Sequence, residues 1–177
     1  MSKINIYVIA TLIIFLSSCS ENKYPIDLDA GDCFIDLGIT DEVRDLGITN
    51  LVRGRESIKD TDTVDVVTCS EPHNGEVILK YSTVPEIYRT IEDPIEMLCG
   101  NETVAFLKFL HPNADDSQMD NLFRKFDERF SYTFNFVAHE NSDEPNFNER
   151  VTCAIVSLDS LLIGNVDKII RNFDINN

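Results

Sequence analysis

The residues best suited to chemistry lie in one short stretch, residues 69–77, where a histidine and two glutamates stand close to a cysteine. His73 and Glu76 are three residues apart, a spacing that would place both on one face of a helix. The proline before the histidine and the Asn-Gly pair after it favour a turn instead. We therefore expect a turn histidine bonded to backbone or carboxylate. The alternative is a weak cation or proton site formed by Glu71, His73 and Glu76.

No other pattern in the chain predicts catalysis. The serines lie in no nucleophile elbow, and no phosphate loop or dinucleotide fingerprint occurs. Carboxylates are too numerous to single out a glycosidase pair. His111, before a proline, is expected at a helix end, and His139 in a polar loop. The sequence predicts no cofactor or metal and favours a non-enzymatic binding or structural role. The alternative is an envelope hydrolase or metal-binding protein that uses Glu71, His73 and Glu76.

Net charge limits the kinds of partner. The 177 residues include 31 acids and 15 bases, which gives a formal charge of −16. A surface of this sign repels polyanions, so nucleic acid is not an expected partner. The length suits one domain with a substantial core and is short for two.

The first 18 residues have the layout of a secretory signal peptide. Lys3 precedes an almost wholly apolar run from Ile4 to Leu16, which is too short to span a bilayer. The ending Leu16-Ser17-Ser18-Cys19 resembles a bacterial lipobox, so we expect lipidation of Cys19. Residues 19–25 would then form the lipidated cysteine and a polar tether, and residues 26–177 the single folded domain. This predicts a lipid-anchored protein on the extracytoplasmic face of the cell membrane, with an envelope protein as partner.

Four cysteines remain once Cys19 is assigned to the lipid. An even number in an exported domain predicts disulfides, and four cysteines allow three pairings. The preferred pairing joins neighbours in sequence order, Cys33 with Cys69 and Cys99 with Cys153. Zinc ligation is disfavoured because no two cysteines have the spacing of zinc ligands.

The order of apolar patterns favours an α+β fold, with an antiparallel sheet, two or three helices and two stapling disulfides. β-branched runs predict strands at 64–69 and 76–81, joined as a hairpin, and later strands at 130–137 and 150–156. Asp93-Pro94 predicts the start of a helix that ends before His111, and residues 113–116 cap the next helix. Residues 166–173 are expected to form a strand or a terminal helix.

Helical periodicity assigns a buried face to each helix. The apolar stripe of the second helix consists of Met119, Leu122, Phe123 and Phe126. The face expected for the first helix consists of Ile95, Leu98, Cys99, Glu102, Ala105, Phe106 and Phe109.

Taken together, the cysteine-containing blocks resemble the septum formation domain family of actinobacterial envelope proteins. The blocks are Gly31-Asp32-Cys33-Phe34, the stretch from Val67 to Val77, the helical Cys99, Glu149-Arg150-Val151-Thr152-Cys153, and Leu161 to Val166. Phe147 stands about where the family usually has a tryptophan, and Asn148 where it tends to have glycine. The resemblance implies an exported, cysteine-paired domain at the cell surface, with a link to division septa and no known enzymatic activity.

Overall fold

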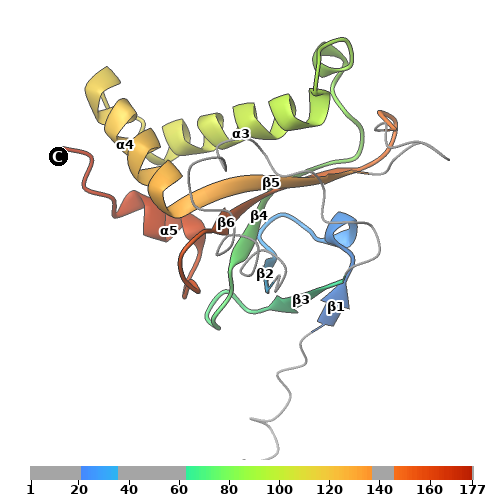
Figure 1. The fold of residues 1–177 in the computed structure, drawn as a ribbon, viewed down its shortest axis with the longest axis horizontal. Coiled ribbons are helices and arrows are strands. Elements are labelled where there is room, and N and C mark those ends of the chain that lie inside the picture. The colour runs from blue at the N-terminus through green and yellow to red at the C-terminus, as the bar shows by residue number, and fades with distance from the viewer. Residues whose placement is uncertain (1–20, 36–62, 137–145, 177) are drawn as a thin grey trace, which may run out of the picture.

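A computed structural model describes residues 21–35, 63–136 and 146–176 of the chain (Figure 1). The predicted signal peptide, Cys19 and His139 lie outside these ranges. The described part is α+β, as predicted: one six-stranded sheet with helices packed on it. No helix in these ranges is both long and apolar enough to cross a bilayer.

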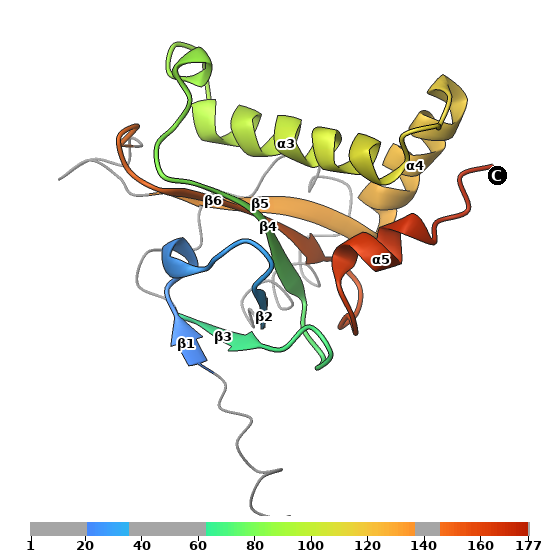
Figure 2. The same ribbon diagram turned by 180° about the vertical axis from the view of Figure 1, so that it is seen from behind.

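All neighbouring strands of the sheet run antiparallel, in the order β1-β3-β2-β4-β6-β5. The longest strands, β4, β5 and β6, form one side of the sheet, and three short strands form the other (Figures 1 and 2). The strands are β1 (Glu21–Lys23), β2 (Cys33–Ile35), β3 (Val64–Val67), β4 (Gly75–Tyr81), β5 (Phe130–Phe136) and β6 (Val151–Ser157).

The predicted hairpin between residues 64–69 and 76–81 is wrong. β3 pairs with β1 and β2, and β2 lies between β3 and β4. β2 has only three residues, Cys33–Ile35, which is too short for a periodic signal in the sequence. Insertion of β2 separates the two strands that the sequence presents as consecutive.

The polar segment predicted as a tether also differs from the structure. Glu21–Lys23 forms β1, an edge strand whose partner is β3. Edge strands tolerate charged side chains because one side of the strand faces solvent. The folded domain therefore begins by Glu21, not after Pro25.

The described residues contain three α-helices, α3 (Pro94–Leu110), α4 (Asp116–Arg129) and α5 (Val166–Arg171), with short 3-10 turns at Pro25–Asp27 and Glu86–Tyr88. The terminal segment is thus a helix. α3 starts with Pro94 as predicted, but Asp93 has a left-handed backbone and no side-chain cap. α4 carries a full capping box, in which Asp115 and Gln118 exchange hydrogen bonds of 2.9 Å.

Strand β6 is buried on both faces and joins the layers of the core. Ile155 packs in a cluster with Leu122 and Phe126 of α4. Ala154 and Val156 pack on the opposite face with Phe34 and other residues of the N-terminal half. The alternation of side chains along a strand explains why one strand serves both clusters.

The predicted face of α4 is confirmed, since Leu122 and Phe126 are buried and Met119 and Phe123 pack against the same cluster. The predicted face of α3 is right for Ile95, Leu98 and Cys99, which are buried, and for Phe106, which packs against the same cluster as Leu122. Beyond Cys99 the buried positions are Thr103, Leu107 and Leu110, whereas Ala105 and Phe109 are exposed. Several apolar residues lie side by side at this end of α3, so periodicity alone did not fix which of them face the sheet.

Candidate functional site

Both predicted disulfides are present, which excludes the other two pairings. Cys33–Cys69 joins β2 to the segment after β3, and Cys99–Cys153 joins α3 to β6. Each therefore connects elements that are distant in sequence. Removal of such links typically destabilises small exported domains by several kcal/mol.

The segment from Cys69 to Gly75 is held against the chain that follows β6. His73 and Leu162 form a β-bridge, in which each backbone N–H donates to the other's carbonyl oxygen, at 3.1 and 2.6 Å. The backbone N–H of Gly164 donates to the carbonyl oxygen of Cys69 at 2.6 Å. The stretch from Cys69 to Gly75, which was predicted to be a hairpin turn, is thus fixed by hydrogen bonds to the segment from Leu162 to Gly164. We call this region, with the disulfide to Cys33, the Cys33–Cys69 corner.

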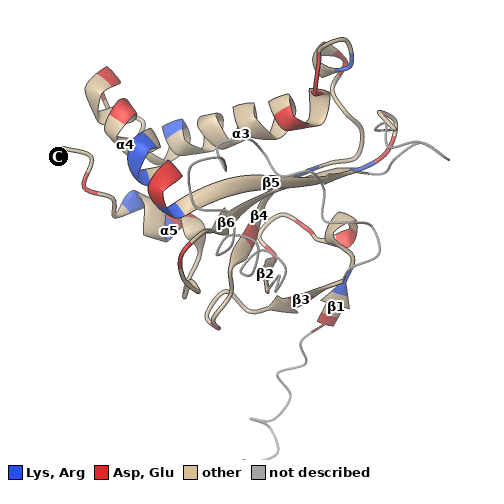
Figure 3. Cartoon of the chain, in the orientation of Figure 1, with Lys and Arg blue, Asp and Glu red and all other residues tan. Residues whose placement is uncertain are grey.

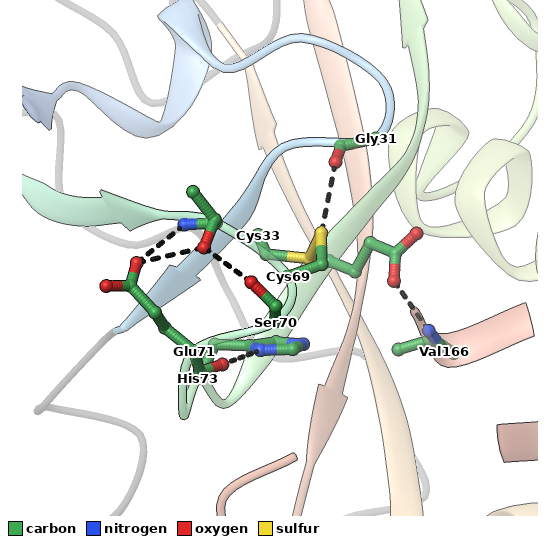
Figure 4. The surroundings of a disulfide bond; sticks show 9 residues. Gly31, Cys33, Cys69, Ser70, Glu71, His73 and Val166 are labelled. Atoms are coloured by element: carbon green, nitrogen blue, oxygen red, sulfur yellow. Dashed lines mark hydrogen bonds between the residues drawn. A yellow bond between two sulfur atoms is a disulfide. The ribbon is translucent and has the colours of Figure 1, made fainter. Parts of the chain in front are cut away.

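His73 is fully buried in this corner, with none of its surface exposed. Its ring atom Nδ1 lies 2.9 Å from the carbonyl oxygen of Glu71 (Figure 4). Since a carbonyl oxygen can only accept, Nδ1 carries the proton and donates. The expectation of a histidine bonded to the backbone is confirmed.

Glu76 projects from β4 toward the start of α5. Its Oε2 accepts a hydrogen bond of 2.6 Å from the backbone N–H of Val166. Burial raises the pKa of this carboxyl group, and the hydrogen bond from Val166 opposes the rise. The carboxylate thus links the sheet to the terminal helix.

Glu71 does not join the other two candidate residues. Its Oε2 accepts hydrogen bonds of 3.1 Å from both the backbone N–H and the hydroxyl of Thr68. In the described part of the chain, Cys33, His73 and Glu76 are instead the group whose ligand atoms lie within 4.8 Å of one another. The predicted group is therefore wrong in Glu71. Cys33 takes its place, and it lies on β2, a strand that the sequence did not predict.

Gly75 has a specific reason to be glycine, which is close packing and not a turn. It is the first residue of β4 and pairs with Phe34 of β2. A Cβ built on Gly75 would lie 2.2 Å from the Phe34 ring, closer than real Cβ atoms approach. The ring fills the space that the glycine leaves, as aromatic residues do over glycines in sheets.

His111 lies at the end of α3, as predicted. Its Nε2 is 3.1 Å from the carbonyl oxygen of Ile170 in α5. This contact ties α3 to α5.

A second feature is the outer face of α3, which the sequence did not predict. Met97 and Phe109 expose 51% and 70% of their surface. Figure 3 shows a ribbon of α3 that is mostly uncharged, although the chain is strongly acidic. The exposed residues of this face are Met97, Asn101, Val104, Ala105, Lys108 and Phe109, none of them acidic.

A scan against protein-family models, a search of curated proteins and a search of solved structures each found no match to this chain.

Proposed function

We propose that this chain is an exported surface lipoprotein, anchored through Cys19 on the extracytoplasmic face of the cell membrane. Its domain binds an envelope protein or has a structural role there, in connection with septum formation. The observation that carries the proposal is the pair of disulfides in a domain that follows a lipobox-like sequence directly. Disulfides of this kind form and persist outside the reducing cytosol.

The short distance between Cys19 and the fold supports a defined orientation. β1 begins at Glu21, two residues after Cys19, so a lipid on that cysteine leaves little free chain. In both ribbon views β1 lies at the opposite end of the domain from α3 (Figures 1 and 2). An anchor before β1 would therefore direct the outer face of α3 away from the bilayer.

The outer face of α3 is the surface that we assign to the protein partner. Exposed apolar residues in a group are typical of interaction sites. The absence of acids among the exposed residues of α3 lets an apolar protein surface approach without burying an unpaired carboxylate. Lys108 offers one cation at the rim for an acidic group of the partner.

Metabolic labelling tests the anchor. A bacterial host that expresses the full chain should incorporate labelled palmitate and retain the protein in the membrane fraction. Cys19→Ala should lose both the label and the membrane association. Equal labelling of wild type and Cys19→Ala, or no label in either, would refute lipidation.

Site-specific crosslinking tests the partner surface. A photoreactive amino acid at Phe109 in intact cells should give a discrete crosslinked protein. The same amino acid at Asp120, an exposed position of α4, serves as the matched control. Crosslinks of equal yield and pattern from both positions would contradict the assignment of α3.

A further inference from the structure

One ring nitrogen of His73 is buried without a hydrogen-bond partner in the part of the chain that the structure describes. His73 uses Nδ1–H to bond the carbonyl oxygen of Glu71, which leaves Nε2 with a free lone pair. Within the described residues, Nε2 of His73 is buried and has no hydrogen-bond partner. An unsatisfied buried polar atom costs about 1–3 kcal/mol. A fold that holds an unpaired nitrogen atom at a fixed buried position keeps that atom available to bind a ligand.

The tautomer of His73 is the one that metal-binding histidines adopt. Such histidines donate the second ring N–H to a backbone carbonyl or a carboxylate, which fixes the ring and directs the other nitrogen at the metal. The bond from Nδ1 to Glu71 provides this support. His73 thus has an oriented ring and an available Nε2.

Two further candidate ligand residues lie close to His73. Ligand atoms of Cys33, His73 and Glu76 lie within 4.8 Å of one another. The sulfur of Cys69 is bonded to that of Cys33, so reduction would leave a second thiolate next to this group (Figure 4). Ligand atoms around a tetrahedral zinc ion are about 3.3–3.8 Å apart, given bonds of ~2.0–2.3 Å. Movements of about 1 Å would bring the ligand atoms of Cys33, His73 and Glu76 to that spacing.

We propose that reduction of the Cys33–Cys69 disulfide converts this corner into a zinc site. Its four ligands are the thiolates of Cys33 and Cys69, Nε2 of His73 and the carboxylate of Glu76. In the oxidised state the sulfur atoms are not thiolates, so they are poor metal ligands. The corner is closed by a covalent bridge in one redox state and by a metal ion in the other.

The reductant is a dithiol, and its attack has one accessible target. Cys33 is 1% exposed, whereas Cys69 is partly exposed. A thiolate of the dithiol attacks the sulfur of Cys69, the disulfide breaks, and Cys33 leaves as a thiolate. The second thiol then attacks the mixed disulfide and releases Cys69. The dithiol loses two electrons and two protons as it closes to a disulfide, and zinc binding later displaces the protons from the two cysteines.

The second disulfide is an internal control. Cys99 and Cys153 are both fully buried in an apolar cluster with Leu98 and Phe134. Neither belongs to a group of candidate metal ligands in the described ranges. Reduction of this bridge would yield two thiols and no metal site.

Cobalt(II), which replaces zinc in such sites and is coloured, provides the test. The chain from residue 20 onward is reduced with a phosphine, because dithiols bind the metal themselves, and is titrated with cobalt without oxygen. One cobalt per chain is expected, with thiolate-to-metal charge-transfer absorption and the intense visible bands of a tetrahedral ion. The oxidised protein should show neither.

Variants locate the site. Glu76→Gln and His73→Gln should each weaken cobalt binding at least about tenfold, the effect that loss of even an outer-shell partner has. Asp120→Asn is the matched control and should leave the affinity unchanged, because Asp120 is an exposed residue of α4 outside the proposed site. Cys33→Ser/Cys69→Ser should lose the charge-transfer band.

Three results would overturn the proposal. These are absence of thiolate bands in the reduced protein, equal affinity in Glu76→Gln and wild type, and a band that persists without Cys33 and Cys69. Far-ultraviolet circular dichroism monitors folding during the titration. A reduced chain that unfolds should refold when cobalt or zinc is added, and one that stays unfolded would also refute the site.

Discussion

Removal of the Cys99–Cys153 disulfide should destabilise the domain strongly. The variant is Cys99→Ala/Cys153→Ala, and the measured quantity is the free energy of unfolding. The bridge spans 54 residues of sequence and fixes α3 to β6, a strand that is paired on both sides. Its loss should therefore affect the packing of helix on sheet as well as the unfolded chain.

The expected magnitude follows from loop length and burial. Closure of a loop of 54 residues removes unfolded-state entropy equivalent to about 4 kcal/mol. Both cysteines are fully buried, and each lost sulfur removes packing worth roughly 0.8 kcal/mol, as for a methylene group. The sum, about 5–6 kcal/mol, is a large part of the ~5–15 kcal/mol that stabilises a typical domain.

Urea unfolding without reductant, followed by circular dichroism, measures the loss. The comparison variant is Cys33→Ala/Cys69→Ala, whose bridge spans 36 residues and should contribute about 4 kcal/mol by the same entropy argument. Because Cys69 is partly exposed, the packing loss there is smaller, so this variant should be the more stable of the two. A loss below about 1 kcal/mol for Cys99→Ala/Cys153→Ala would refute the reasoning.

Three further substitutions test local features of the fold. Gly75→Ala should lower the free energy of unfolding by about 1–3 kcal/mol, measured in urea, because the new Cβ meets the Phe34 ring. Adding Phe34→Leu should recover part of that loss. Equal stability of Gly75→Ala and wild type would contradict the close packing. Asp115→Ala removes the capping box of α4 and should lower the free energy of unfolding by about 1 kcal/mol. Thermal unfolding of the variant and the wild type measures this difference. Burial and the hydrogen bond to Glu102 raise the pKa of Tyr81 to about 12 from 10.0, so the neutral phenol is favoured by the folded state. The stability that Tyr81 contributes should be complete below pH 10 and lost as pH rises through about 12, which Tyr81→Phe should abolish; identical pH profiles would contradict it.

Much of the fold follows from local sequence signals. Proline at the start of α3, the acidic cap of α4 and the alternating aromatics of β5 each predict an element that the structure contains. The disulfide pairs also follow, because neighbours in sequence order are the simplest pairing. These signals are local, so they specify elements better than the way those elements associate.

Strand order could not be predicted from the same signals. β1 and β2 have three residues each, too few for a periodic pattern, and both pair with β3. Local signals favour a hairpin between β3 and β4, but β2 lies between these two strands and pairs with both. The exposed position of Phe109 has a similar cause, since the helix could bury either Phe109 or Leu110 and the packing of α5 decides.

The candidate site was predicted in part. His73 and Glu76 stand in the motif itself, and their proximity follows from their short separation. Cys33 could not be assigned to the same site because its approach depends on β2 lying beside β4. Glu71 was wrongly included since a local hydrogen bond to Thr68 directs its carboxylate elsewhere.

Intact mass spectrometry of the protein extracted from native membranes without reductant tests the central claim most directly. The account predicts a chain that begins at Cys19, carries the mass of a diacylglyceryl group or of a further acyl chain, and lacks four thiol hydrogens for its two disulfides. A chain that keeps residues 1–18, an unmodified Cys19, or free thiols at the four remaining cysteines would contradict the account.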